Sequence, residues 1–218
     1  MVTNSEKIKS LLKEFPKTYS EELGIDLMSR KPSEIFKWFL ASILFGHRIS
    51  ETIAKKTYKE FEKERLLTPE NILDAGWDEL VRVLDNGGYV RYDFSTASAL
   101  LEIMKCLKDK YGSLEKLYDD TKESKDLEKK FKEFRKVGPV TVNIFLRELR
   151  VVWPKANTDI SKFVKLSAEN LGIDLKKLNK KTDNFVHLEA ALLRLGKDYC
   201  NKKKCGICRF DKSCYHEI

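Results

Sequence analysis

Two segments of helical periodicity are joined through a tight turn by the sequence Phe134-Arg135-Lys136-Val137-Gly138-Pro139-Val140-Thr141-Val142-Asn143. Gly138 is expected to let the backbone turn without a clash at a Cβ atom, and Pro139 has the φ of a first helical residue. The first-turn amides of the following helix are then free to face an anion. The segment is either an ordinary helix connector or a hairpin that holds a DNA phosphate without reading base sequence.

Most of the remaining chain also carries apolar residues at helical spacing. Prolines and glycines mark several of the expected boundaries. The expected helices cover 5–15, 32–46, 50–61, a short segment opened by Thr68-Pro69-Glu70, 77–84, 94–111, 124–134, 140–150, 160–171 and 182–195. Because no segment alternates convincingly as a strand does, the sequence predicts an all-α protein. Cys106, inside one of these helices, is expected to pack as a small buried side chain.

Length and composition narrow the class of protein. At 218 residues the chain can form one sizeable core or two small ones. It has no run of 18 apolar residues, and its polar start does not resemble a signal peptide, so we expect a cytoplasmic protein that does not bind membranes. The net charge of +8 favours a polyanionic partner, although 42 basic and 34 acidic residues also suit the highly charged surface of many thermophile proteins.

Four of the five cysteines, Cys200, Cys205, Cys208 and Cys214, lie close together near the end of the chain, with the spacing C-x4-C-x2-C-x5-C. Four convergent thiolates suit a soft metal, either one tetrahedral zinc ion or the four irons of a [4Fe–4S] cluster. Two disulfides are the alternative, and a reducing compartment disfavours them. The residues therefore predict a metal-bound loop and leave zinc and iron–sulfur open.

The order of these features resembles the endonuclease III superfamily of DNA base-excision glycosylases. The resemblance rests on a helix, the Val137-Gly138-Pro139 hairpin, a second helix, a loop, Asp159 at a helix start and the terminal four-cysteine loop, and it covers nearly the whole chain. It implies a two-domain helix-hairpin-helix architecture: a six-helix barrel over 29–145, and a discontinuous cluster domain formed by 1–28 plus 146–218. It also implies a [4Fe–4S] cluster on the four cysteines, and a monomeric, nucleoid-associated enzyme that flips a damaged or mismatched base out of double-stranded DNA.

Asp159 and Val140 are the two positions from which the resemblance implies a reaction mechanism. Asp159 matches the family's essential aspartate, which stabilises positive charge developing on the sugar; as the residue before a helix, it also suits an N-cap. Val140 stands where members that also nick the strand have a Schiff-base lysine, so the resemblance implies a monofunctional glycosylase. The alternatives are a glycosylase with AP lyase activity that uses another lysine, a non-enzymatic helix-hairpin-helix DNA-binding protein, and a zinc-stabilised protein-interaction domain.

The resemblance also supplies a set of expected DNA contacts. In the hairpin they are Lys136, which replaces the family's first hairpin glycine, with Val137, Gly138, Val140 and Thr141. His47, followed by Arg48, and Tyr89 take the positions of the residues that fill the gap left by a flipped base. Lys202, Lys203 and Lys204 lie in a first cysteine gap two residues shorter than usual and are expected along the DNA backbone. Trp38, Phe45 and Tyr92 are candidates for the base pocket, with core packing as the favoured alternative.

Overall fold

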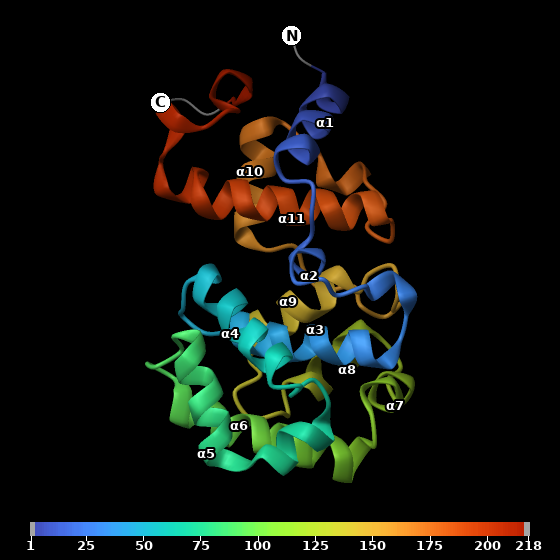
Figure 1. The fold of residues 1–218 in the computed structure, drawn as a ribbon. Coiled ribbons are helices and arrows are strands. Elements are labelled where there is room, and N and C mark those ends of the chain that lie inside the picture. Colours follow the sequence, from blue (N-terminus) through green and yellow to red (C-terminus); the bar gives the residue numbers. More distant parts are fainter. Residues whose placement is uncertain (1–2, 216–218) are drawn as a thin grey trace. The chain divides into compact units, whose positions relative to one another are not determined.

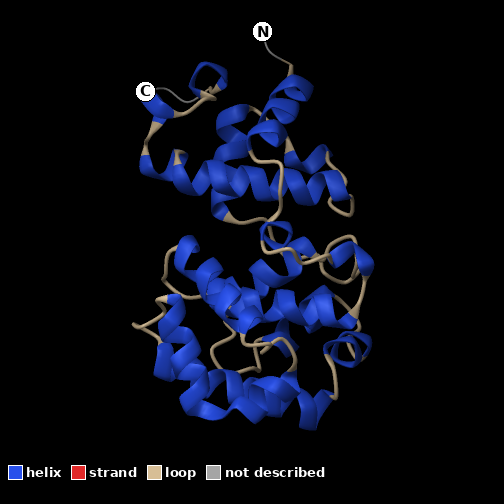
Figure 2. Ribbon diagram, in the orientation of Figure 1, coloured by secondary structure: helices blue, strands red, loops and turns tan. Residues whose placement is uncertain are grey.

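The structure is a computed structural model that describes residues 3–215, and within this range the chain forms helices and loops without a strand (Figure 2). The all-α prediction is confirmed. The α-helices are α1 (Asn4–Glu14), α2 (Tyr19–Glu22), α3 (Pro32–Phe45), α4 (Glu51–Lys63), α5 (Pro69–Gly87), α6 (Asp93–Cys106), α7 (Leu114–Asp119), α8 (Ser124–Phe131), α9 (Pro139–Glu148), α10 (Lys162–Leu171) and α11 (Asp183–Asp198). None of the helices in the described range is long and apolar enough to cross a membrane.

The chain divides into two compact units. The terminal unit combines Met1–Glu22 with Asp159–Ile218, and the central unit is Leu23–Thr158. The terminal unit thus combines segments from early and late in the chain. The division by contacts places residues 23–28 and 146–158 with the central unit, whereas the sequence prediction assigned them to the cluster domain.

The core of the central unit surrounds α3, which is apolar on nearly every face. Phe39 is fully buried and packs against the rings of Phe131 and Phe145, at centroid distances of 5.5 and 5.2 Å. Trp38 is also fully buried, and its Nε1 donates a hydrogen bond to the Phe145 carbonyl at 3.0 Å. Helix α9 is therefore fixed against α3, and the hairpin before α9 is held by the core.

Helix α5 begins with the Thr68 cap and Pro69 and is interrupted at Gly76, whose φ of 74° is not helical. The two separate helices expected for this region therefore correspond to the two halves of α5. Near its end, a Cβ atom on Gly87 would come 2.5 Å from the Cα of Thr57 in α4. A glycine is needed at this close approach of two backbones.

Three elements differ from the sequence prediction: α2, whose four residues were not predicted as a helix, and α7 and α8. Helix α7 was not predicted, because its six residues between the Ser113 cap and Asp120 are too few to display a helical period. Helix α8 ends at Phe131 rather than at Phe134, and the residues that follow form the turn into the hairpin. By contrast, α6 continues as a π-helical turn, Leu107–Tyr111, and ends at Gly112 as expected.

In the terminal unit, α10 packs on α11, and α1 from the other end of the chain lies beside them (Figure 1). The Ser167 hydroxyl in α10 donates to the Leu192 carbonyl in α11 at 2.7 Å. Lys7 in α1 is buried, and its Nζ donates to the Leu171 carbonyl at the end of α10 at 2.8 Å. A positive charge at the C-terminus of a helix also interacts favourably with the helix dipole. Lys7 therefore stabilises the packing of α1 in this unit.

Candidate nucleic-acid interface and catalytic loop

The hairpin between α8 and α9 has its left-handed residue at Lys136, with a φ of 61°. The Val137 amide donates to the Phe134 carbonyl at 3.1 Å and closes the turn. Gly138 is the N-cap of α9 and has an ordinary φ of −89°, and a Cβ atom added there would meet nothing within 4 Å. The expectation that Gly138 relieves a backbone clash was therefore wrong: Lys136 adopts the conformation that glycine favours, and Gly138 faces open space.

The hairpin residues differ in what they present to a partner. Lys136 is exposed, and the Val140 side chain is 62% exposed. Val137 and Thr141 are buried, at 3% and 4% exposure, so the predicted DNA contacts at these two positions would have to run through the backbone. A Cβ atom on Gly46 would come 2.0 Å from Oγ1 of Thr141, which shows how closely Thr141 packs against the end of α3.

The first turn of α9 offers unused donors. Gly138 provides no side-chain cap, and Pro139 has no amide proton. The amides of Val140 and Thr141 precede the first residue whose amide can reach an intrahelical acceptor, and Val142 donates to the Gly138 carbonyl at 3.0 Å. This helix start can therefore receive an anion.

His47 lies just beyond the end of α3, half-buried against two tyrosines. Its ring centroid is 5.2 Å from that of Tyr92 and 5.9 Å from that of Tyr89. Burial, and secondarily the positive charge of Lys136, lower the pKa of His47 below 6.5. Both effects favour the neutral imidazole, while the neighbouring Arg48 is exposed.

The Tyr89 side chain is buried, whereas the family resemblance implied that it fills the gap left by a flipped base. It is 0% exposed, and its hydroxyl donates to the Leu44 carbonyl at 2.7 Å. Burial also raises the pKa of Tyr89. The neighbouring Val90 is 64% exposed and is the outward residue of this loop. Sequence reasoning missed Val90, because one residue of register decides which side chain the loop presents.

The three candidates for the base pocket also differ in how far their side chains are buried. Trp38 belongs to the core, because it is fully buried with its indole nitrogen bonded to the Phe145 carbonyl. Phe45 and Tyr92 are half-buried, and the Phe45 ring centroid lies 6.3 Å from that of Trp38. Only Phe45 and Tyr92 of these three retain accessible surface.

The loop before Asp159 is held by side chains from the preceding helical segment. Arg150 is buried at 2% exposure, and its guanidinium donates to the Thr158 carbonyl at 2.8 Å and to Asn157 Oδ1 at 3.3 Å. The Asn143 amide donates to the Thr158 hydroxyl at 3.3 Å. Sequence reasoning missed Arg150, although a charged residue among apolar helix positions is a signal for a buried polar contact.

Asp159 follows directly after this fixed segment and is exposed. Helix α10 begins at Lys162, and its N-cap is Ser161, whose hydroxyl accepts from the Val164 amide at 3.3 Å. The expectation that Asp159 caps the helix was therefore wrong. The carboxylate lies in the loop two residues before the cap.

The four clustered cysteines line one small cavity together with Asn170, Tyr199 and Asp211, and all are free thiols. Burial raises the pKa of Cys200 and of Cys208, and it raises the pKa of Cys214 to about 11; the charges of the neighbouring cysteines add to each shift. Among residues 3–215, no three His, Cys, Asp or Glu side chains surround a point that would hold a single metal ion. The donor set is nonetheless four cysteines around one space, which is the set that a cubane cluster takes, one thiolate per iron.

The lysines of the first cysteine gap are all exposed. Lys203 has a φ of 52°, which turns the chain there. Lys202 is partly neutralised, because its Nζ lies 3.3 Å from a carboxylate oxygen of Asp198. Lys203 and Lys204 are the stronger candidates for binding a polyanion.

Comparison with known proteins gives matches in structure alone. No protein-family model and no curated protein matches the sequence. A solved structure of endonuclease III trapped as a covalent intermediate with DNA, in an estranged-adenine complex, matches 99% of this chain and 97% of its own, with 18% identity and a TM-score of 0.57. A non-covalent complex of endonuclease III with DNA matches 99% of this chain and 96% of its own, with 17% identity and a TM-score of 0.58. Over nearly its whole length, this chain has the fold of endonuclease III.

Proposed function

We propose that the protein is a base-excision-repair DNA glycosylase that hydrolyses the N-glycosidic bond of a damaged base flipped out of double-stranded DNA. The observation that carries the proposal is the exposed carboxylate of Asp159, directly after a segment fixed by the buried Arg150. The endonuclease III fold supports it, because both matched structures of that protein are complexes with DNA. We further propose that the enzyme acts as a monomer on nucleoid DNA.

The chemistry requires a negative charge near the sugar. When the bond between C1′ and the base nitrogen breaks, the electron pair leaves with the base and positive charge develops on the sugar ring. The Asp159 carboxylate stabilises this charge and accepts a proton from the water whose oxygen adds to C1′. This proton then passes to the departing base or to solvent. Removing a preorganised electrostatic partner of this kind costs about 3–4 kcal/mol of transition-state stabilisation.

The proposed enzyme leaves an abasic site without nicking the strand. A lyase step needs an amine that attacks C1′ to form a Schiff base. Val140, at the position where the family resemblance implies that lysine, has no nucleophile. Lys136 is exposed in the hairpin turn, and we assign its ammonium group to the DNA phosphates instead.

DNA is proposed to be held through its backbone and around the gap left by the flipped base. The first-turn amides of α9 and the ammonium of Lys136 suit a phosphate, as do Lys203 and Lys204 in the cysteine loop. Val90, exposed at the tip of its loop, replaces Tyr89 as the side chain that enters the gap. His47 and the exposed Arg48 form the second candidate contact, with Phe45 and Tyr92 as the remaining candidates for the base pocket.

The four cysteines are proposed to hold a [4Fe–4S] cluster, since their number and shared cavity suit four thiolate bonds. The cluster would fix the loop that carries Lys202, Lys203 and Lys204, and bond cleavage does not pass through it. A colourless protein containing one zinc per chain would contradict this assignment and favour the zinc-stabilised alternative.

The test is excision from duplexes that carry uracil, hypoxanthine, 3-methyladenine, 8-oxoguanine, thymine glycol or a mismatch, with and without alkali after the reaction. We expect strand breaks at one or more lesions only after alkali, because hydrolysis leaves an intact abasic strand. Breaks without alkali, together with a borohydride-trapped adduct, would favour the glycosylase with lyase activity. DNA binding without excision of any lesion would favour the non-enzymatic protein.

A further inference from the structure

The terminal unit contains a second cavity that the proposed reaction does not use. It has a volume of about 430 Å³, within the range of sites for small ligands. The apolar part of its lining consists of Ile160, Ala168, Ile173 and Leu175. Ile160, Ala168 and Ile173 are themselves nearly buried, at 9%, 1% and 6% exposure, so this surface is fixed by the core of the unit.

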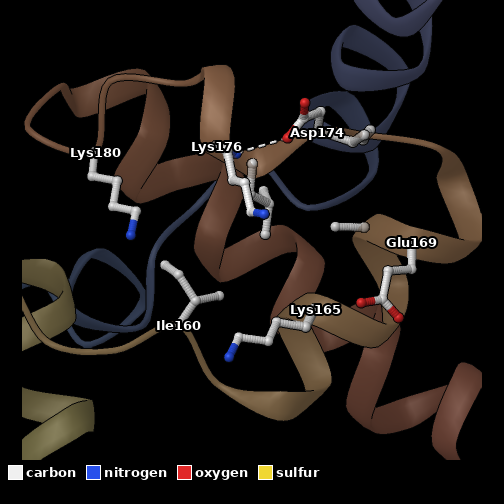
Figure 3. A pocket seen from close by; sticks show the side chains of 9 residues that line it. Ile160, Lys165, Glu169, Asp174, Lys176 and Lys180 are labelled. Carbon is white, nitrogen blue, oxygen red and sulfur yellow. Dashed lines mark hydrogen bonds between the residues drawn. The ribbon is translucent and has the colours of Figure 1, made fainter.

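Three lysines also line the cavity, and each comes from a different segment. Lys165 lies on α10, Lys176 in the short turn Leu175–Lys177, and Lys180 in the loop before α11. Figure 3 shows the three side chains around Ile160, with Glu169 to one side. Within residues 3–215, none of the three ammonium groups has an ion-pair partner.

The two carboxylates of the lining do not neutralise these lysines. The Asp174 side chain accepts a hydrogen bond from the Lys176 amide at 3.0 Å, and its other oxygen lies 3.7 Å from Nζ of Lys177, which is outside the cavity lining. Glu169 stands apart and can accept a hydrogen bond from an amino or hydroxyl group. The cavity thus combines an apolar wall, a concentration of positive charge and one hydrogen-bond acceptor.

We propose that this cavity binds a single nucleotide, with its base against the apolar wall and its phosphate among Lys165, Lys176 and Lys180. A flat apolar body with an anionic group follows from the lining alone. The choice of a nucleotide rests on the proposed function. It also rests on Ile160, a residue of the cavity wall that directly follows the proposed catalytic residue Asp159 in the chain. The nucleotide comes either from the free pool or from an unpaired position of a DNA strand.

The test is calorimetric titration of the purified full-length protein with deoxyadenosine monophosphate, deoxyadenosine, inorganic phosphate and phenyl phosphate. The monophosphate should bind at least about tenfold more tightly than deoxyadenosine or phosphate, because neither carries both recognition elements. The variant combining Lys165→Gln, Lys176→Gln and Lys180→Gln should lose at least about tenfold in affinity for the monophosphate. Lys181→Gln is the matched control and should not change this affinity, since the exposed Lys181 follows Lys180 but does not line the cavity.

A second arm identifies the source of the nucleotide. If the triple variant loses affinity for duplexes with an unpaired terminal nucleotide but not for blunt duplexes, the ligand belongs to the DNA strand. Equal affinity of the triple variant and the original for both duplexes, with loss of monophosphate binding, assigns the free nucleotide. The proposal is overturned if the monophosphate does not bind, if it binds no better than phosphate, or if only phenyl phosphate binds. Because binding is measured without base excision, failure of the glycosylase proposal would be seen separately.

Discussion

Lys136 and Gly138 have different roles in the hairpin. Lys136 holds the left-handed backbone conformation, whereas Gly138 has an ordinary φ and open space where a side chain would be. A Cβ at 138 would meet no atom of the protein, so beyond the general preference for glycine at an N-cap, the close approach of a ligand backbone is a physical reason for a glycine there.

Gly138→Ala tests this reasoning. We expect the free energy of unfolding to fall by no more than about 1 kcal/mol, because the new Cβ meets no other atom and the only loss is that alanine is a poorer N-cap than glycine. Affinity for undamaged duplex DNA should fall by about tenfold or more, because the methyl group would stand between the α9 amides and a phosphate. Denaturant unfolding and fluorescence anisotropy measure the two quantities, and unchanged affinity would show that no phosphate lies there.

His47 and His187 should give stability opposite dependences on pH. The pKa of His47 in the folded protein is lowered below 6.5. Its contribution to the free energy of unfolding is therefore complete above that pH and is lost as the pH falls. Partial burial opposes protonation of His187, but the Asp183 carbonyl and the carboxylates of Glu21 and Asp183 outweigh it and raise its pKa. The contribution of His187 is therefore complete below pH 6.5 and is lost as the pH rises through the folded pKa.

The measurement is the unfolding free energy of the original, His47→Gln and His187→Gln proteins between about pH 5 and 8. Relative to the original, His47→Gln should be least destabilising at the acidic end and His187→Gln at the basic end. Parallel curves for the two variants would contradict the assigned environments of these side chains.

The packing of α10 on α11 depends on one glycine. A Cβ atom on Gly196 would lie 2.0 Å from the Phe163 carbonyl oxygen, so the two helices must separate to accommodate it. Gly196→Ala should lower the free energy of unfolding by about 3 kcal/mol or more, since overpacking against backbone is relieved only by moving a helix. Gly206→Ala is the matched control, because a Cβ there meets nothing within 4 Å. Equal stability of the two variants would contradict the close helix contact.

The helices were largely predictable, because caps, prolines and apolar periods act locally. Thr68-Pro69 opens α5 and Gly112 ends the π-helical extension of α6 where the residue types predict. Helix α7 was not predicted, because six residues are too few to show a helical period. The site was predictable only in part: the cysteines share one cavity as their spacing predicted, but the burial of Tyr89 beside the exposed Val90 is decided by tertiary packing.

At the scale of the whole molecule, the net charge of +8 should appear in the salt dependence of DNA binding. Replacing Lys203 and Lys204 by Gln should weaken binding to damaged and undamaged duplexes alike, and should flatten the slope of log affinity against log salt by about 0.9 per lost phosphate contact. Lys202→Gln is the matched control and should have a smaller effect, because Lys202 already pairs with Asp198. Loss of affinity for one lesion alone would contradict a backbone contact.

The decisive experiment compares the original protein with Asp159→Asn on one lesion-bearing duplex and records both single-turnover excision and DNA affinity. Asp159 is exposed, the preceding residue Thr158 is held by Arg150, and the N-cap of α10 is Ser161. The substitution should therefore leave the fold intact. We predict that excision slows by about a hundredfold to a thousandfold while affinity stays within about threefold, because the carboxylate acts on charge that develops only in the transition state. Excision by Asp159→Asn at the original rate would contradict the account.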